Sequence, residues 1–141
     1  MEEFLCKELS HEIIGICIKI QKEYGNSHNE RIYHRVLEEK LASKNIKFLS
    51  KPKIKIYSLD SDKVLGYYEP DLLINDIIIL ELKAKTVSIN SDYNQLMQYL
   101  KTTAYEIGYL INFGIVPLQF KRIIYSNNRK KFMLNVNSIK E

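Results

Sequence analysis

The sequence has no tryptophan, only two cysteines and no long apolar run. Cys6 and Cys17 have no second pair to complete four zinc ligands, and two cysteines are too few for a disulfide scaffold, so we expect buried thiols. No window reaches the ~18 apolar residues that a membrane-spanning helix needs. The start, MEEFLCKELS, is acidic and polar, and it lacks the basic and apolar regions of a secretory signal. These absences predict a cytoplasmic protein that has no membrane partner.

Several signatures of catalysis and of repetitive architecture are also missing. The chain contains no glycine-rich phosphate loop, no dinucleotide-binding fingerprint and no Ser/His/Asp arrangement, and it shows no internal repeat or low-complexity tract. Its three histidines are scattered along the chain. His34 follows Glu30 by one helical turn, so a contact with a site at Glu30 is one interpretation, but we expect a surface histidine.

What the chain does contain is typical of one folded unit. Its 141 residues are 45% hydrophobic and 27% charged, which is close to the average for globular chains. We therefore predict a single domain over residues 1–126, followed by a basic C-terminal segment over 127–141 that packs in part.

The formal net charge of +4 is unevenly distributed. The basic excess lies after residue 120, and a second run between residues 40 and 55 contains six lysines and no acid. Such runs are typical either of a solvated face or of phosphate binding, and both interpretations stay open. Lysine outnumbers arginine by 17 to 4, which argues against base-specific readout by bidentate arginine. The candidate nucleic-acid-binding residues are Lys51, Lys53, Lys55, Lys121 and Arg122.

Hydrophobic periodicity predicts the secondary structure. Apolar residues recur every three or four positions in 5–24, 29–44 and 91–106, which favours helices that end at Gly25, Asn45 and Gly108. Ser91 or Asp92 can cap the third helix. Alternating or continuous apolar runs predict strands at 53–57, 64–68, 72–74, 77–83, 109–113 and 120–125. This order predicts an α/β protein with one mixed central β-sheet flanked by helices.

Charged residues gather at one predicted hairpin, which turns at Asn75-Asp76. Glu69-Pro70-Asp71 precedes its first strand and Glu81-Leu82-Lys83 ends its second. Glu81 and Lys83 share one face of the strand, so two carboxylates and an ammonium come within reach of one point. Two carboxylates suit Mg²⁺ or Mn²⁺, and a nearby lysine can orient or deprotonate a nucleophile. The alternative is a structural ion pair between Glu81 and Lys83, with Asp71 in a turn.

These residues resemble the core motif of the PD-(D/E)XK nuclease superfamily, and Pro70 matches the proline of that motif. More narrowly, the chain resembles the GxxExxY family of small proteins in that superfamily. One departure is Ser27, which stands where that family has glycine, so the direction of Glu30 stays open. Five blocks carry the resemblance, in this order: Glu30-Arg31-Ile32-Tyr33, 66–74, 79–84, 95–100 and 110–114.

The resemblance implies a restriction-endonuclease-like core and a role for each motif residue. Asp71 and Glu81 would be metal ligands, and Lys83 would be the catalytic lysine. The Leu82 carbonyl and the Glu30 carboxylate would complete the metal site. The structural alternative for Glu30 is that it caps its helix.

Two residues of the predicted third helix match the QxxxY element of RecB-like nucleases. Gln95 and Tyr99 lie one helical turn apart, so both side chains can face the same site, and they would join the catalytic group. The alternatives are that Gln95 is solvated and that Tyr99 packs in the core. Of the ten tyrosines, Tyr67 and Tyr68 lie beside the acidic motif and are the candidates for stacking on bases.

The resulting hypothesis is a metal-dependent nuclease that uses Mg²⁺ or Mn²⁺ to hydrolyse phosphodiester bonds in DNA, with RNA as the less favoured substrate. The alternative is a catalytically silent nuclease-fold module that binds nucleic acid or assembles with protein, as a homodimer or in a larger complex. Fold alone does not choose between them. The intact Asp71, Glu81 and Lys83 favour the enzyme, whereas the small size favours a module that works with a partner.

Overall fold

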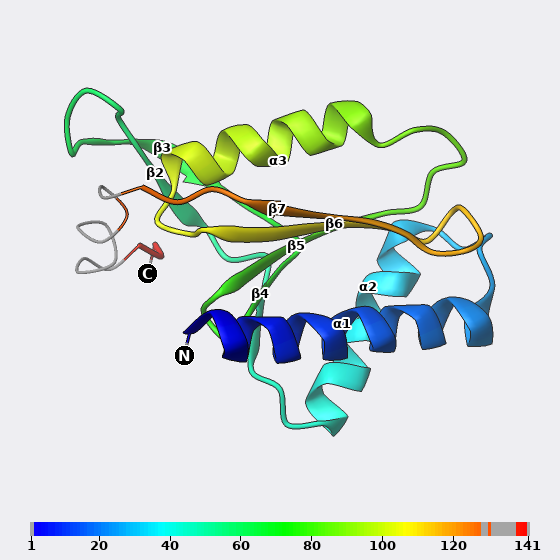
Figure 1. Cartoon of the computed structure of the whole chain (residues 1–141). Helices are drawn as coiled ribbons and strands as arrows, with labels where there is room; N and C mark the ends of the chain where they lie inside the picture. Colours follow the sequence, from blue (N-terminus) through cyan, green and yellow to red (C-terminus); the bar gives the residue numbers. More distant parts are fainter. Residues whose placement is uncertain (1, 128–129, 131–137, 141) are drawn as a thin grey trace.

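The chain folds into a five-stranded sheet that lies between helices (Figure 1). The computed structural model describes residues 2–127, 130 and 138–140, with the backbone alone for 2–5. Helices α1 and α2 cover one face of the sheet and α3 covers the other. The elements run in the order α1 (Glu2–Tyr24), α2 (Glu30–Ser43), β1 (Phe48–Ser50), β2 (Ile54–Tyr57), β3 (Val64–Tyr68), β4 (Leu72–Ile74), β5 (Ile78–Lys83), α3 (Asn90–Thr102), β6 (Ile107–Asn112) and β7 (Gln119–Ile124).

The sheet has the strand order β1-β4-β5-β6-β7 and is mixed. β5 and β6 pair in parallel, and α3 connects them, because a parallel pair needs a crossover. The other neighbouring pairs are antiparallel. This arrangement confirms the predicted α/β class, with a mixed central sheet and a restriction-endonuclease-like core.

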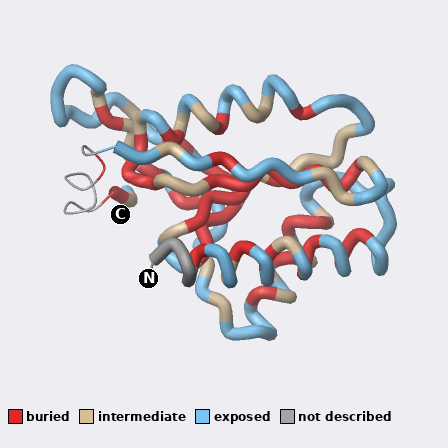
Figure 2. The backbone as a smooth tube through the Cα atoms, viewed as in Figure 1, coloured by how far each residue is buried: buried red, intermediate tan, exposed pale blue. Residues whose placement is uncertain are grey.

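The continuous apolar run of β5 is buried on both faces, as a central strand requires (Figure 2). Ile78, Leu80 and Leu82 belong to the core cluster under α1 and α2, whereas Ile79 belongs to the cluster under α3. Side chains alternate along a strand, so Glu81 and Lys83 share the face of Ile79 and lie on the α3 side of the sheet. This alternation places the acid and the lysine of the motif.

Local sequence signals position several chain reversals as predicted. Gly25 ends α1 with a φ of 80°, a left-handed conformation that glycine adopts without a steric penalty. Asn29 caps α2, because its Oδ1 accepts a hydrogen bond from the Ile32 N–H at 3.1 Å, so the alternative that Glu30 caps this helix is wrong. Asn75 and Asp76 have φ values of 52° and 56°, which suit the tight turn between β4 and β5.

The structure differs from the prediction in two respects, which concern β1 and the pair β2 and β3. The sequence does not predict β1, because this strand is only three residues long, lies in the lysine-rich run and, among the residues that the structure describes, pairs with β4 alone. β2 and β3 form a separate two-stranded sheet instead of joining the central one. The chain turns away between β1 and β2, where Lys51 has a φ of 49° and Pro52 has no N–H to donate.

The predicted limits of the third helix are also wrong. α3 begins at Asn90 and ends at Thr102. Its N-cap residue, Ile89, forms no capping hydrogen bond with its side chain, and the Asn90 N–H donates instead to the Ser88 Oγ at 3.2 Å. Gly108 does not end the helix but lies within β6, where a Cβ would come 3.2 Å from a methyl group of Leu96. Close packing of the helix on the strand therefore explains this glycine better than a helix stop.

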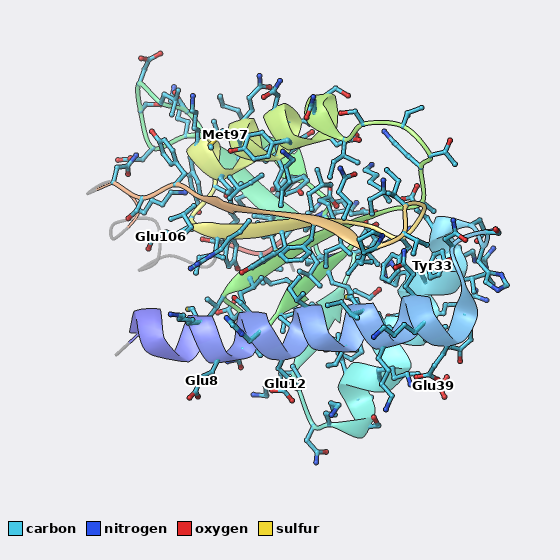
Figure 3. All side chains as sticks on the ribbon, turned by 45° about the vertical axis from the view of Figure 1, so that its right-hand side comes forward. Glu8, Glu12, Tyr33, Glu39, Met97 and Glu106 are labelled. Carbon is cyan, nitrogen blue, oxygen red and sulfur yellow. The ribbon has the colours of Figure 1, made fainter. Side chains whose placement is uncertain are left out.

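α1 is amphipathic along its length, with Glu8 and Glu12 pointing away from the sheet (Figure 3). Cys6 and Cys17 are both buried on this helix, as predicted. Within the described part of the chain, no helix is both long enough and apolar enough to cross a lipid bilayer.

Two pieces of the basic C-terminal segment contact the rest of the fold. The buried Lys130 ammonium donates hydrogen bonds to the carbonyls of Leu100, Thr103 and Tyr105, which close the C-terminal end of α3. Burial lowers the pKa of Lys130 to about 8, although the nearby Glu106 acts in the opposite direction. Ser138 and Lys140 pair with the backbone of β2 and its approach. Arg129, Lys131 and the apolar residues 132–134 lie outside the described residues.

Gly114 follows β6 where the chain passes close to Lys85. A Cβ on Gly114 would lie 2.3 Å from the Lys85 carbonyl oxygen. We predict that Gly114→Ala lowers the free energy of unfolding by about 2–4 kcal/mol, because backbone must shift to admit a methyl group. Gly15→Ala is the matched control: Gly15 lies within α1, has no atom within 4 Å of its Cβ position, and alanine there should stabilise by about 1 kcal/mol. Urea unfolding measures both, and equal stability of the two variants would contradict the close approach.

Candidate active site

Asp71 and Glu81 lie opposite each other where β4 and β5 meet. The Glu81 Oε1 accepts a hydrogen bond from the Asp71 N–H at 3.0 Å, and the Asp71 Oδ2 accepts one from the Leu82 N–H at 2.7 Å. Leu72 and Leu80, the next residues along the two strands, are paired, and this pairing brings Asp71 and Glu81 together. Each carboxylate is therefore oriented by the backbone of the other strand.

Glu81 is a largely buried acid beside a second acid. Burial, and then the negative charge of Asp71, raise the pKa of Glu81 to about 7. The Asp71 N–H, the nearby Tyr68 hydroxyl and the Lys83 ammonium act in the opposite direction without outweighing them. No ion pair within 4 Å joins Glu81 to Lys83 in the part of the chain that the structure describes. The alternative of a structural Glu81–Lys83 pair is therefore not what the chain forms.

Asp92, which the sequence predicts as a possible helix cap, is an acidic neighbour of Lys83. Asp92, in the first turn of α3, lies with its Oδ1 3.8 Å from the Lys83 Nζ and its Oδ2 2.6 Å from the Lys85 Nζ. Asp92 was a candidate helix cap, but it bridges two lysines instead. α3 therefore helps to position the ammonium of Lys83.

Hydrogen bonds from the end of β6 hold the backbone at the end of β5. The buried Asn112 accepts a hydrogen bond from the Lys85 N–H at 2.9 Å and donates one to the Lys85 carbonyl at 3.0 Å. The Phe113 N–H also donates to the Lys83 carbonyl at 2.8 Å. These hydrogen bonds hold the backbone that carries Lys83. They also supply the partners that backbone N–H and C=O groups need when they are removed from water.

Tyr68 and Tyr99 form a stacked pair on the Glu81 side of the sheet. Their ring centroids are 3.8 Å apart, with an interplanar angle of 9°. The buried Tyr68 hydroxyl lies next to Glu81 without a partner in hydrogen-bonding geometry among the described residues. Burial, and then the Glu81 charge, raise the pKa of Tyr68. Tyr99 thus reaches the acidic pair through Tyr68. Gln95 is exposed on α3, and its side chain forms no hydrogen bond within the described chain.

A pocket of about 590 Å³ opens on the other side of Asp71, between α2 and the end of β1. Three of the four predicted metal ligands, Glu30, Asp71 and Leu82, line it, but Glu81 and Lys83 do not. Asp71 therefore stands between two faces of the sheet. The complete lining is Glu30, Arg31, His34, Arg35, Glu38, Ser50, Lys51, Asp71 and Leu82.

Tyr33 explains how Glu30 comes to line this pocket despite Ser27. Its ring stacks on Phe113 at a centroid distance of 4.4 Å, and its hydroxyl donates a hydrogen bond to the Gly25 carbonyl at 2.6 Å. Tyr33 lies on α2 near its start (Figure 3). It therefore ties the beginning of α2 to the end of β6 without the expected glycine.

His34 lines this pocket, and the prediction of a surface histidine is wrong. Only 8% of His34 is exposed. Its Nε2 lies 2.9 Å from the Ser50 Oγ and 3.7 Å from a Glu38 oxygen, and its Nδ1 lies 3.9 Å from the Asp71 Oδ1. The signal was its position one turn after Glu30, but only packing of α2 on β1 buries it.

The predicted nucleic-acid-binding residues do not form one surface. Lys51 follows β1 at one edge of the central sheet, and Lys121 and Arg122 lie on β7 at the opposite edge. Lys53 and Lys55 lie at and beside β2 in the separate two-stranded sheet. A strand of nucleic acid would meet these groups at different places.

Asp71, Glu81 and Lys83 at the end of a mixed sheet define the site type of a restriction-endonuclease-like nuclease fold. A sequence profile of the PD-(D/E)XK nuclease superfamily matches residues 7–123, and the chain belongs to this superfamily. Comparisons with curated proteins and with solved structures give no significant match. The narrower resemblance to the GxxExxY family stays a prediction.

PD-(D/E)XK nucleases generally use divalent metals, and the residues here fit such an ion in part. Glu81 is a largely buried carboxylate beside a second carboxylate, and the charge of such a pair needs compensation. Across the described residues, no group of three or more His, Cys, Asp and Glu side chains is arranged as metal ligands. Two carboxylates are nevertheless sufficient for Mg²⁺, which keeps several waters and takes phosphate oxygens as further ligands.

The raised pKa of Glu81 predicts how stability depends on pH in the absence of metal. The folded state favours protonated Glu81, so this contribution is complete below the ordinary pKa of 4.5 and is lost as the pH rises through about 7. Glu81→Gln removes this titration. In EDTA, the variant should match the wild type near pH 4.5 and exceed its free energy of unfolding by about 3 kcal/mol at pH 8.

Urea unfolding between pH 4.5 and 8 measures this difference. Glu39→Gln, which removes the same charge from an exposed position on α2, is the control and should keep the pH dependence of the wild type (Figure 3). A constant offset between Glu81→Gln and the wild type at all pH values would contradict the proposed burial of charge.

Proposed function

We propose that this protein is a metal-dependent nuclease of the GxxExxY type that hydrolyses phosphodiester bonds, in DNA before RNA. The single observation that carries the proposal is the reciprocal bonding of Asp71 and Glu81 with the backbone of β4 and β5. It holds two carboxylates in a fixed orientation, next to a lysine on the same face of β5. Preorganised charge of this kind is what phosphodiester hydrolysis needs.

Asp71, Glu81 and the carbonyl of Leu82 would hold Mg²⁺ or Mn²⁺. A bound ion would offset negative charge that develops on the phosphate and would lower the pKa of a water. Glu30 lines the same pocket as Asp71 and would take part through a water.

Lys83 would act on the attacking water from the α3 side of the sheet. Its ammonium would orient the water, and its neutral amine form would accept a proton from the water. Asp92 would act as a positioning residue, because it holds Lys83 and Lys85 from α3. Tyr99 would support Glu81 through Tyr68, and Gln95 would contact the substrate from the exposed face of the same helix.

A second function, a silent nuclease-fold module that binds nucleic acid or a protein partner, is supported by a different observation. Glu81 and Lys83 lie outside the pocket that Glu30 and Asp71 line, and Asp92 holds Lys83. In such a module, the site would bind without turnover, as one copy of a homodimer or in a larger complex.

A cleavage assay separates the two functions. Pure protein with Mg²⁺ or Mn²⁺ should degrade single- or double-stranded DNA, or RNA, and Asp71→Asn and Lys83→Ala should each slow cleavage at least about a hundredfold. Lys101→Ala, an exposed lysine on α3, should cleave like the wild type. Equal cleavage by all four proteins would identify a contaminant, and no cleavage by any of them would favour the silent module.

Metal binding can be measured apart from cleavage. An ion that binds only the folded state at 100 times its Kd adds about 2.7 kcal/mol, so Mn²⁺ should raise the Tm of the wild type by about 9 °C. Asp71→Asn should lose most of this rise, because it removes one of two carboxylate ligands. Glu39→Gln should retain it. An undiminished rise in Asp71→Asn would place the ion elsewhere.

A further inference from the structure

The pocket beside Asp71 contains a cluster of basic side chains that the metal chemistry does not use. Arg31 and Arg35 lie one turn apart on α2, and Lys51 follows β1 on the opposite wall. All three are exposed, and none forms an ion pair within the described chain. The pocket thus gathers two of only four arginines in the sequence.

Lys51 is held in an uncommon conformation at this place. Its φ of 49° lies in the left-handed region, which residues other than glycine rarely adopt. Its N–H donates a hydrogen bond to the Asp71 carbonyl at 2.9 Å, and the next residue, Pro52, is buried. Backbone strain of this kind concentrates at functional sites. The hydrogen bond from its N–H joins Lys51 to the residue whose carboxylate is a proposed metal ligand.

The charge of the lining depends on the metal. Arg31, Arg35 and Lys51 are balanced by Glu30, Glu38 and Asp71, so the pocket is nearly neutral as it stands. Glu38 and Asp71 lie on either side of His34, away from a direct ion pair with either arginine in the described chain. A divalent ion at Asp71 would therefore leave the pocket with an excess of positive charge, which favours an anion.

We propose that this pocket binds the phosphodiester backbone of the nucleic-acid strand next to the bond that is cleaved. Arg31 and Arg35 suit phosphate, because the planar guanidinium donates two parallel hydrogen bonds to its oxygens. The volume of about 590 Å³ lies in the range of sites that hold small ligands, such as one nucleotide unit. The inference rests on the proposed function for its substrate, and it assigns the strand to the β1 edge of the sheet rather than to β7.

Binding of labelled single-stranded DNA and RNA oligonucleotides tests the proposal. All proteins carry Lys83→Ala to prevent turnover, and Mg²⁺ is present. The Arg31→Gln/Arg35→Gln double variant should bind at least about tenfold more weakly, and the slope of log Kd against log salt should fall by about 1.4, because two phosphate contacts are lost. Lys51→Gln should weaken binding about threefold and lower the slope by about 0.7.

Charge-matched variants distinguish a defined contact from general attraction. The Lys7→Gln/Lys19→Gln double variant removes two exposed charges from α1 and should change Kd less than twofold. Arg31→Lys/Arg35→Lys retains the charge but not the paired donors, and should recover only part of the affinity. Thermal unfolding of each variant shows whether it is folded. Omitting Mg²⁺ should weaken the double arginine variant less than it weakens the protein with both arginines, because the metal and the arginines act on one strand.

Several outcomes would overturn the inference. Equal weakening by the α1 and pocket variants would indicate diffuse attraction, and loss of binding only in Arg122→Gln would place the strand at β7. Absence of oligonucleotide binding would also overturn it. Cleavage by the wild type with unchanged affinity in the pocket variants would refute this inference alone. Pocket-dependent binding without cleavage by the wild type would refute the nuclease alone. Preference for the DNA or the RNA oligonucleotide identifies the strand.

Discussion

Two hydrogen bonds across the β4–β5 pair organise the whole site. One joins the Asp71 N–H to Glu81 and the other joins the Leu82 N–H to Asp71. They extend the strand pairing with side-chain acceptors, so the carboxylates cannot move apart without breaking these two hydrogen bonds. Because Glu81 is also buried beside Asp71, the arrangement holds charge where the fold alone compensates it poorly. The negative charge that would bind a cation at this position therefore lowers the stability of the fold when no cation is bound.

Other elements contact the region of Asp71 and Glu81 from both faces of the sheet. From one face, α3 brings Asp92 to Lys83 and Tyr99 to Tyr68, while Asn112 holds the backbone after Lys83. From the other face, α2 brings His34 towards Asp71 and Glu30 into the pocket. Asp71 is therefore the residue through which the two halves of the candidate site meet. This division gives the Lys83 face and the phosphate-binding pocket separate surroundings, so their contributions can be tested separately.

Prediction from the sequence succeeded where the signal is local. The tight turn at Asn75 and Asp76 brings two short apolar runs together, and this places Asp71 opposite Glu81. The existence of β1, the separation of β2 and β3 from the central sheet and the limits of α3 were not predictable in this way. A three-residue strand has no period to detect, and Gly108 can mark either a helix end or close packing against Leu96. Only the packing distinguishes these two roles of one glycine.

The sequence by itself determined the order of most helices and strands, the superfamily and the acidic pair, because these depend on periodicity and on residues about ten positions apart. The tertiary structure alone decided which groups surround that pair. Asp92 contacts two lysines instead of capping α3, and His34 is buried although the sequence predicts a surface histidine. Arg31 and Arg35 come to face Lys51 across a pocket. Such contacts join elements far apart in the chain, and they follow from how α2 and α3 pack on the sheet rather than from any local pattern.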